Sequence, residues 1–421
     1  MRVALLRRVA FIIVRTARPV YYYSCQNNLS MTDRLYYTDS YLRQFTAHVA
    51  ALSADGLSVY LDRTAFYPTS GGQPCDTGTL AGIPVAGVTE DESGIAHQLA
   101  SPLAAGPADR AIQCAIDWDR RFDHMQQHTG QHLLSAVFEE RFGLKTVGFH
   151  MGAEMSTIDL EGKLDPSSAS EAELRANRIV CENRLVAISF EDAAGAQGLR
   201  KASAREGALR IVSIEDFDRS ACGGTHVRST GEIGPVLLRK LEKVRQTVRV
   251  EFLCGGRAVR RARADFEALS KIAQIFSAPL DDVPALAAAQ LEASRAQEKA
   301  RRKLELELAA YQGKELYQTT APDAAGFRRV TRRADRGNLE DLRAIAQNFT
   351  AQPKAVFLAA LSDPPSVLLA ASEDAGVDAG KLLKAALAEA GGRGGGTPRI
   401  AQGSVPDARS LDQVVAKLAA D

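Results

Sequence analysis

Two short segments, far apart in the chain, each carry a pair of metal-binding side chains at a spacing of four residues. His128 and His132 flank Thr-Gly-Gln, and Cys222 and His226 flank Gly-Gly-Thr. On a helix, residues i and i+4 point to the same side, so the two histidines can bind the same metal ion. The glycines of the second segment allow a tight turn. Three imidazoles and one thiolate suit a tetrahedral Zn²⁺, which requires a fold that brings the two segments together.

The ligand types narrow what such a metal could do. A metalloprotease of the HExxH kind needs a glutamate as general base directly after the first histidine, and here Thr129 occupies that position. A structural zinc finger normally uses at least two closely spaced cysteines. The pattern therefore favours a functional site. Four protein ligands would leave zinc no open position, so the sequence leaves open whether His226 binds directly and whether the metal is catalytic or only positions a substrate.

Composition sets wider bounds on the 421-residue chain, which is long enough for several domains. Hydrophobic residues make up 45% and charged residues 24%, which is typical of globular proteins. The formal net charge is +1, so binding to nucleic acid would need local basic patches. Six cysteines without a CxxC pair indicate a reducing compartment, and we expect a cytoplasmic protein.

Residues 1–30 differ from the rest, because five arginines precede the first acidic residue, Asp33. Arginine-rich, acid-poor starts are typical of targeting segments, which leaves organellar targeting open. The alternative is that the folded protein begins near Met31, after a misassigned start or a disordered tail. The apolar run at residues 9–14 is too short to span a bilayer, and no membrane association is expected.

Residues 31–118 alternate apolar and polar residues in short runs between turns, which predicts a small β-rich module, a compact barrel. Within it, Gly71 and Gly72 lie near Pro68 and Pro74 and mark a tight loop. Such a loop can let backbone approach a ligand, or it can be only a turn, and the sequence leaves both open.

Residues 119–256 predict an α+β zinc-binding domain. Apolar residues recur at helical spacing through the segment that carries both histidines, and a second helix is expected around residues 170–185. Residues 156–160, 209–212 and 248–253 read as strands, which we expect to form a sheet under the histidine helix.

Residues 257–320 predict a helical spacer, either one long exposed helix or a helical hairpin, rich in Ala, Glu, Lys and Arg. Residues 321–421 predict a small α/β domain with buried strands and a helix at residues 379–389. A glycine run follows at residues 391–396, which is either a loop that binds phosphate or a structural turn. A homodimer through the spacer or the C-terminal domain is left open.

Together the motifs resemble one family. Phe-Tyr-Pro at residues 66–68, Gly-Gly-Gln at 71–73, the two histidines and the Cys222 segment stand in the order and spacing of the editing region of alanyl-tRNA synthetases. The chain most closely resembles the free-standing AlaX-type trans-editing proteins. The glycine run with Pro398 resembles the C-terminal tRNA-binding domain of the same synthetases. No stretch resembles the aminoacylation core, so alanine–tRNA ligase activity is not expected.

The resemblance implies a deacylase that hydrolyses tRNA(Ala) mischarged with serine or glycine. Residue by residue it implies a Zn²⁺ site made by His128, His132, Cys222 and His226. It implies that Gln73 and the backbone of Gly71 and Gly72 line the catalytic site and stabilise an oxyanion. It also implies that Thr64 recognises the serine hydroxyl through a hydrogen bond. The chain departs from the family pattern at Ser70, where glycine is common, and at residues 397–399 of the glycine motif.

The tRNA 3′ end is then expected to enter between the β-module and the histidine helix. Basic residues at 239–249 either steer the acceptor stem or form a solvated face. A second hypothesis is a tRNA-binding protein in which zinc only staples the fold, without hydrolytic activity.

Overall fold

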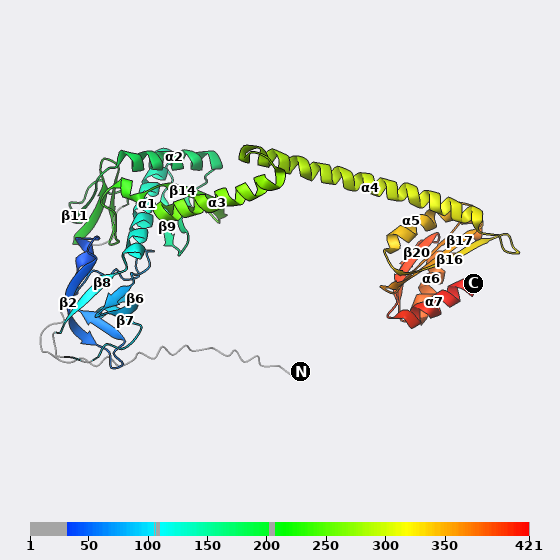
Figure 1. Cartoon of the computed structure of the whole chain (residues 1–421), viewed down its shortest axis with the longest axis horizontal. Helices are drawn as coiled ribbons and strands as arrows, with labels where there is room; N and C mark the ends of the chain where they lie inside the picture. Colours follow the sequence, from blue (N-terminus) through cyan, green and yellow to red (C-terminus); the bar gives the residue numbers. More distant parts are fainter. Residues whose placement is uncertain (1–31, 105, 107–109, 202–206, 421) are drawn as a thin grey trace, which may run out of the picture. The chain divides into compact units, whose positions relative to one another are not determined.

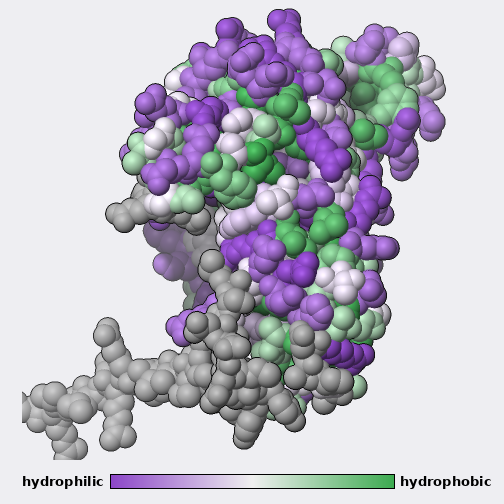
Figure 2. Space-filling model, turned by 90° about the vertical axis from the view of Figure 1, so that its left-hand side faces the viewer, coloured by the Kyte–Doolittle hydropathy of each residue, from purple (hydrophilic) through white to green (hydrophobic). Residues whose placement is uncertain are grey.

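The structure is a computed structural model that describes residues 32–104, 106, 110–201 and 207–420, so residues 1–30 lie outside the described part. The chain forms two compact units, Met1–Ser270 and Lys271–Asp421 (Figure 1). Both mix helices with sheets, which confirms the α+β class. Among the described residues, no helix is long and apolar enough to cross a membrane. On the face drawn in Figure 2, hydrophobic areas are scattered among hydrophilic ones, as is usual for a water-exposed surface.

The first unit begins with a closed antiparallel barrel, as the alternating runs predict, with the strand order β2-β3-β7-β6-β5-β8. Inward-facing residues, among them Phe45, Val59 and Leu80, fill its core. A short parallel pair, β1 (Asp33–Arg34) with β4 (Arg63–Thr64), lies outside the barrel order. The barrel strands are β2 (Gln44–Leu52), β3 (Ser58–Leu61), β5 (Gly78–Leu80), β6 (Ile83–Asp91), β7 (Gly94–Leu99) and β8 (Ala111–Ile116).

Helix α1 (Trp118–Phe142) follows the barrel directly and carries both histidines (Figure 1). The side chain of Asp117 caps its first turn by accepting from the Arg120 N–H, and Gly143 ends it in the left-handed conformation. Its apolar side packs on the sheet β14-β15-β10-β9, as the α+β pattern predicts. These strands are β9 (Thr146–Met151), β10 (Ser156–Glu161), β14 (Val236–Val244) and β15 (Thr247–Cys254).

A second sheet in this unit, β11-β12-β13, shares the core of α1. Helix α2 (Pro166–Glu182) packs against α1 and β14. It begins earlier than the sequence predicts because the Asp165 side chain caps its start, and it ends earlier because Asn183 takes the left-handed conformation. The strands of the second sheet are β11 (Val186–Asp192), β12 (Ala208–Ile214) and β13 (Asp218–Ala221).

A buried ion pair joins the barrel module to α1. Arg121 on α1 and Asp76 in the loop before β5 are both fully buried, and Arg121 Nε lies 3.0 Å from Asp76 Oδ1. Arg121 also donates to the carbonyl oxygens of Ser40 and Ala65, and Asp76 accepts from the Tyr67 N–H. Each charge is therefore fully hydrogen-bonded, which offsets the cost of taking it out of water.

The predicted spacer consists of two helices, α3 (Gly255–Phe276) and α4 (Val283–Thr319). Most of α4 is solvent-exposed, but its last turns belong to the core of the second unit. There Ala309 is buried, and the Tyr317 hydroxyl donates to the Pro353 carbonyl oxygen across a distance of 2.9 Å.

The second unit is a five-stranded sheet, order β16-β17-β18-β20-β19, with helices on both faces. Alternate residues of β17 face opposite sides: Val356 and Leu358 pack under α6 and α7, and Phe357 packs under α5. This burial on both faces explains its continuous apolar sequence. The elements are β16 (Arg328–Arg336), α5 (Leu339–Thr350), β17 (Ala355–Asp363), β18 (Ser366–Ala371), α6 (Ala379–Glu389), β19 (Arg393–Gly396), β20 (Ile400–Ser404) and α7 (Ala408–Ala420).

The glycine run is in part the structural turn that the sequence offers as one alternative, because Gly391, with φ +69°, lies in the turn after α6. Residues 393–396 form the edge strand β19, which pairs with β20 along its whole length. A Cβ on Gly394 would lie 2.5 Å from the Gln402 carbonyl oxygen and 2.6 Å from Leu387 of α6. Glycine is needed here because strand and helix pack too closely for a side chain, which replaces the expectation of a phosphate-binding loop.

Candidate metal centre

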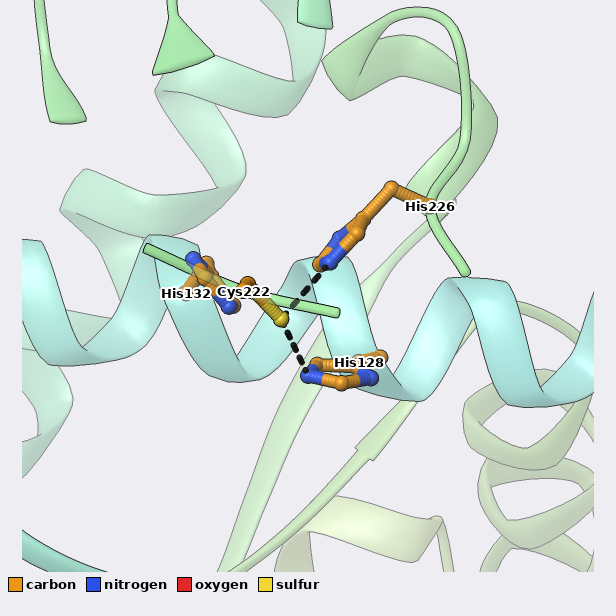
Figure 3. Close-up of side chains that lie close together, drawn as sticks. All are labelled: His128, His132, Cys222 and His226. Carbon is orange, nitrogen blue, oxygen red and sulfur yellow. Dashed lines mark hydrogen bonds between the residues drawn. The ribbon is translucent and has the colours of Figure 1, made fainter. Parts of the chain in front are cut away.

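The four predicted ligands converge at one buried point (Figure 3). His128 and His132 come from adjacent turns of α1, while Cys222 and His226 come from the loop between β13 and η2 (Thr230–Ile233). One donor atom from each of the four lies within 4.8 Å of the others. Cys222 Sγ lies 3.4 Å from His128 Nε2 and 3.4 Å from His226 Nε2.

These distances fit a tetrahedral metal site. Bonds of about 2.0–2.1 Å to nitrogen and about 2.3 Å to sulfur place adjacent tetrahedral ligands roughly 3.5 Å apart. The two sulfur–nitrogen separations of 3.4 Å are close to that edge length. A thiolate with imidazoles is also the donor chemistry that zinc prefers. The residues present therefore fit Zn²⁺.

Each histidine is held from behind through its other ring nitrogen. His128 Nδ1 lies 2.7 Å from Gln73 Oε1, and His226 Nδ1 lies 3.1 Å from Thr129 Oγ1. His132 Nδ1 lies 3.4 Å from Asp218 Oδ2, which is long for a hydrogen bond but within ion-pair range. Such outer contacts fix which nitrogen faces the metal and orient the ring. Thr129, which lacks the chemistry of a protease base, thus has a positioning role.

Gln73 takes part in this support and does not line the substrate cavity. Its side chain is fully buried, its Oε1 contacts His128, and its Nε2 donates to Thr225 Oγ1 at 2.9 Å. The expected role of Gln73 as a donor to a substrate oxyanion needs a free N–H in the cavity wall. The geometry instead makes Gln73 a link between the glycine loop, the ligand His128 and the Cys222 segment.

Glycines in the Cys222 segment and in the turn before Gln73 make the close approach of these segments possible. A Cβ on Gly224 would lie 2.2 Å from His128 Cε1, so only glycine lets the second segment pass over that ring. Gly71 and Gly72 both have positive φ, between hydrogen bonds that join Ser70 and Gln73 in both directions, as in a two-residue hairpin turn. A Cβ on Gly72 would lie 2.6 Å from the Phe149 carbonyl oxygen, so this turn packs directly on β9.

The electrostatics of the cluster suit a cation. Burial would raise the pKa of the Cys222 thiol, but the attraction of His128 and His226 outweighs it and holds that pKa well below its usual value. Burial lowers the pKa of His226 to about 3. Burial opposes a charge on His132, but its contacts with Asp218 and Cys222 raise its pKa to about 9. A metal ion at this site would compete with a proton for the ring of His132.

A cavity of about 750 Å³ opens on the cluster. Its wall includes His128, His132 and Cys222 together with Gly71 from the barrel module. The cavity lining does not include the other predicted residues His226, Gln73, Gly72 and Thr64. A smaller adjoining cavity of about 280 Å³ shares His132 and Gln131 with it and adds Thr146 and Ser220. The pair of cavities has the size of a small-molecule site and a lining that mixes apolar with polar groups, as such sites do.

Thr64, which the resemblance places at the substrate, lines neither of the two cavities. It is fully buried, and its Oγ1 lies 2.8 Å from Nε2 of His97 on β7. The same oxygen accepts from the Phe66 N–H at 3.1 Å. Both partners belong to the barrel module, so in this structure the Thr64 hydroxyl satisfies polar groups inside that module.

Sequence reasoning missed several residues that form the cavities. Gln131 lies within the histidine motif itself, while Thr146 begins β9 and Arg210 lies on β12. The position of Gln131 three residues after His128 places it beside the ligands on the helix, and this spacing could have identified it. Thr146 and Arg210 have no local pattern that links them to the metal.

Two family models match parts of the chain, and several known proteins are similar to it. Residues 209–251 match the threonyl and alanyl tRNA synthetase second additional domain, and residues 330–420 match the DHHA1 domain. The chain is 32% identical to the alanyl-tRNA editing protein AlaX-L of Pyrococcus horikoshii, over 89% of this chain and 95% of that one. It is 37% identical to the alanyl-tRNA editing protein AlaX-M of Methanosarcina acetivorans, over 50% of this chain and 94% of that protein.

Longer relatives and a solved structure were also found. The alanine–tRNA ligase of Pyrococcus abyssi is 29% identical over 92% of this chain, which spans only 43% of the ligase. The crystal structure of the C-Ala domain of Aquifex aeolicus alanyl-tRNA synthetase matches 22% of this chain and 87% of that one, at 22% identity and a TM-score of 0.20. The extent and identity of the match to AlaX-L are decisive, and the chain belongs to the AlaX family of alanyl-tRNA editing proteins.

Proposed function

We propose that this protein edits tRNA(Ala) in trans by hydrolysing the ester that links a wrong amino acid, serine or glycine, to the tRNA. One observation carries the proposal: the large cavity is walled on one side by the metal-ligand cluster and on the other by the Gly71 turn of the barrel. A 3′-terminal aminoacyl ester in this cavity would lie beside the cluster. The family membership supports the same reaction class.

In this proposal the four ligands hold Zn²⁺. Bound zinc can polarise an ester carbonyl or lower the pKa of a water molecule. The residues of the chain do the positioning: Gln73, Thr129 and Asp218 orient the three imidazoles through their outer nitrogens. Gly71 is the residue of the turn whose backbone faces the cavity, and it is our candidate for contact with the developing oxyanion.

The smaller cavity is the proposed pocket for the amino-acid side chain. The Thr146 hydroxyl and the Gln131 amide both donate to Ser135 Oγ, at 2.7 and 2.8 Å, which fixes two polar groups next to His132. A pocket built to hydrogen-bond a hydroxyl discriminates more sharply than an apolar one. Thr146 replaces Thr64 as the candidate that reads serine, whereas glycine would make no such contact.

The decisive experiment is hydrolysis of Ser-tRNA(Ala) and Gly-tRNA(Ala) by the purified zinc-loaded protein. We expect the wild type to release both amino acids and Cys222→Ala to lose activity together with zinc. Thr146→Val should slow release of serine by about tenfold and leave glycine unchanged, because one neutral hydrogen bond is lost. A zinc-loaded, folded wild type that releases neither amino acid would disprove the proposal.

One observation favours the second candidate, a tRNA-binding protein with a structural zinc. All four ligands come from the protein and three of them are buried, which is the closed arrangement of a structural site. Cys222→Ser at saturating zinc separates the two candidates. A structural site predicts lower thermal stability and unchanged turnover per folded molecule, whereas a catalytic site predicts lost turnover at retained stability.

A further inference from the structure

The cavity beside the cluster contains a buried cation that the proposed hydrolysis does not yet use. Arg210, on β12, is only 7% exposed and lines the large cavity together with Cys222 and Gly223. Burial lowers the pKa of Arg210, but a guanidinium remains charged at neutral pH. Keeping such a charge out of water is costly unless partners compensate for it.

Two of the three nitrogens of Arg210 have a partner. Nε donates to the Tyr37 carbonyl oxygen at 2.9 Å, and Nη1 donates to the Cys222 carbonyl oxygen at 2.6 Å. These bonds tie the guanidinium to the backbone of the ligand Cys222 and fix its plane. Nη2 is buried and has no hydrogen-bond partner among the described residues. An unsatisfied donor of this kind is uncommon in folded proteins and calls for a partner, which can be a water molecule or a ligand atom.

The charge of Arg210 is stabilised by the Cys222 sulfur and by the Tyr37 ring, whose centroid lies 5.4 Å from the guanidinium carbon, but by no carboxylate of the described residues. Among the described residues, no acidic side chain lies within ion-pair distance of its guanidinium, although 29 other pairs form elsewhere. The other arginine of this cavity, Arg34, is neutralised by its contact with Glu90. Arg210 is therefore the cation of the cavity wall that is left for an anionic ligand.

We propose that Arg210 binds the phosphate that joins the last two nucleotides of the substrate's 3′ end, with Nη2 donating to a phosphate oxygen. This inference rests on the proposed function, because it takes the tRNA terminus as the occupant of the cavity. The ester itself is neutral before reaction, whereas the phosphodiester carries a full charge in the bound ground state. Arg210 is thus a substrate-binding residue that sets how far the terminal ribose reaches toward the cluster.

The test compares the dinucleotide cytidylyl-(3′→5′)-adenosine with its neutral methylphosphonate analogue, measured by calorimetric titration of the zinc-loaded protein. The wild type should bind the charged dinucleotide about 10- to 100-fold more tightly, as expected for a charge-assisted hydrogen bond. Arg210→Gln should bind both equally, and Arg210→Lys should recover part of the difference. Arg34→Gln, the matched control in the same cavity, should keep the full difference.

Equal binding of the two dinucleotides by the wild type, or binding of neither at millimolar concentration, overturns the proposal even if the Arg210 variants fail to fold. A ratio that persists in folded Arg210→Gln also overturns it and leaves Arg210 a structural support of the Cys222 loop. The binding test is separate from catalysis: a protein that discriminates the dinucleotides but does not hydrolyse Ser-tRNA(Ala) would refute the hydrolase and keep the phosphate site.

Discussion

Two segments of this chain, residues 222–226 and 391–396, are both rich in glycine. They differ in which neighbour the absence of a side chain allows to come close. At residues 222–226 the glycines lie in a loop, and Gly224 passes over the ring of His128 at a distance where no Cβ fits. At residues 393–396 they lie in a strand, and Gly394 lets β19 approach both β20 and α6. In the first segment glycine makes room for the ring of a predicted metal ligand, and in the second it makes room for the packing of one strand against its neighbours.

The difference shows that a glycine run by itself does not predict a binding loop. A glycine can be required by a close approach of any neighbour, whether that neighbour is a functional ring, a backbone oxygen or a packed helix. The identity of the neighbour comes only from the tertiary structure. Substitutions to alanine add one methyl group, so they test each approach separately.

The largest effect is expected for Gly224→Ala. Its methyl group would overlap His128 Cε1, so either the ring or the Cys222 loop must move and the four donor atoms separate. Zinc affinity should fall by roughly 100-fold or more, measured by competition with a chelator. Gly223→Ala is the control, because its nearest neighbour is the Tyr37 hydroxyl at 3.4 Å. Equal zinc affinity of the two variants would contradict the ligand geometry.

A smaller effect, confined to the second unit, is expected for Gly394→Ala. The added methyl would overlap the backbone of β20 and Leu387, and overpacking of this kind costs about 2–3 kcal/mol. Hydrogen exchange of the β17 and β18 amides should become faster, while zinc content stays unchanged. Gly395→Ala has no atom within 4 Å of the new methyl and should behave as wild type. Loss of zinc from Gly394→Ala would contradict the assignment of Gly394 to the packing of the second unit alone.

The smallest effect is expected for Gly71→Ala. The residue has φ +56°, but the nearest atom to a new methyl is the Tyr67 hydroxyl at 3.9 Å. Only the strain of a left-handed alanine remains, about 1 kcal/mol, and it should appear as a small decrease in thermal stability of the first unit with zinc retained. A loss as large as that of Gly224→Ala would mean that the turn itself holds the metal cluster.

Much of the site could be predicted because its ligands follow local rules. The helical period alone places His128 over His132, and the spacing of Cys222 and His226 needs only a turn. The barrel follows from alternating residues, and the buried strand β17 from its apolar run. These features are set by residues close together in the sequence, so they can be predicted from one sequence alone.

The remaining features depend on contacts between distant segments. Thr64 ends β4 and Gln73 follows it by nine residues, yet Thr64 contacts His97 of the barrel and Gln73 contacts His128 on α1. Nothing in their local sequence distinguishes the two directions. Arg210 is one arginine in an ordinary strand, and its missing partner becomes visible only when Tyr37 and Cys222 are placed around it.

The buried pair of Arg121 and Asp76 has a consequence for engineering the protein. Asp76→Ala in the full chain would leave Arg121 buried without its carboxylate, and breaking such a pair costs about 3–5 kcal/mol. The barrel module therefore supplies Asp76, which neutralises Arg121 of the histidine helix, as well as the Gly71 turn. A metal-binding fragment that begins at α1 would lack Asp76, Ser40 and Ala65, so the side chain of Arg121 would be exposed to water and could stay an arginine.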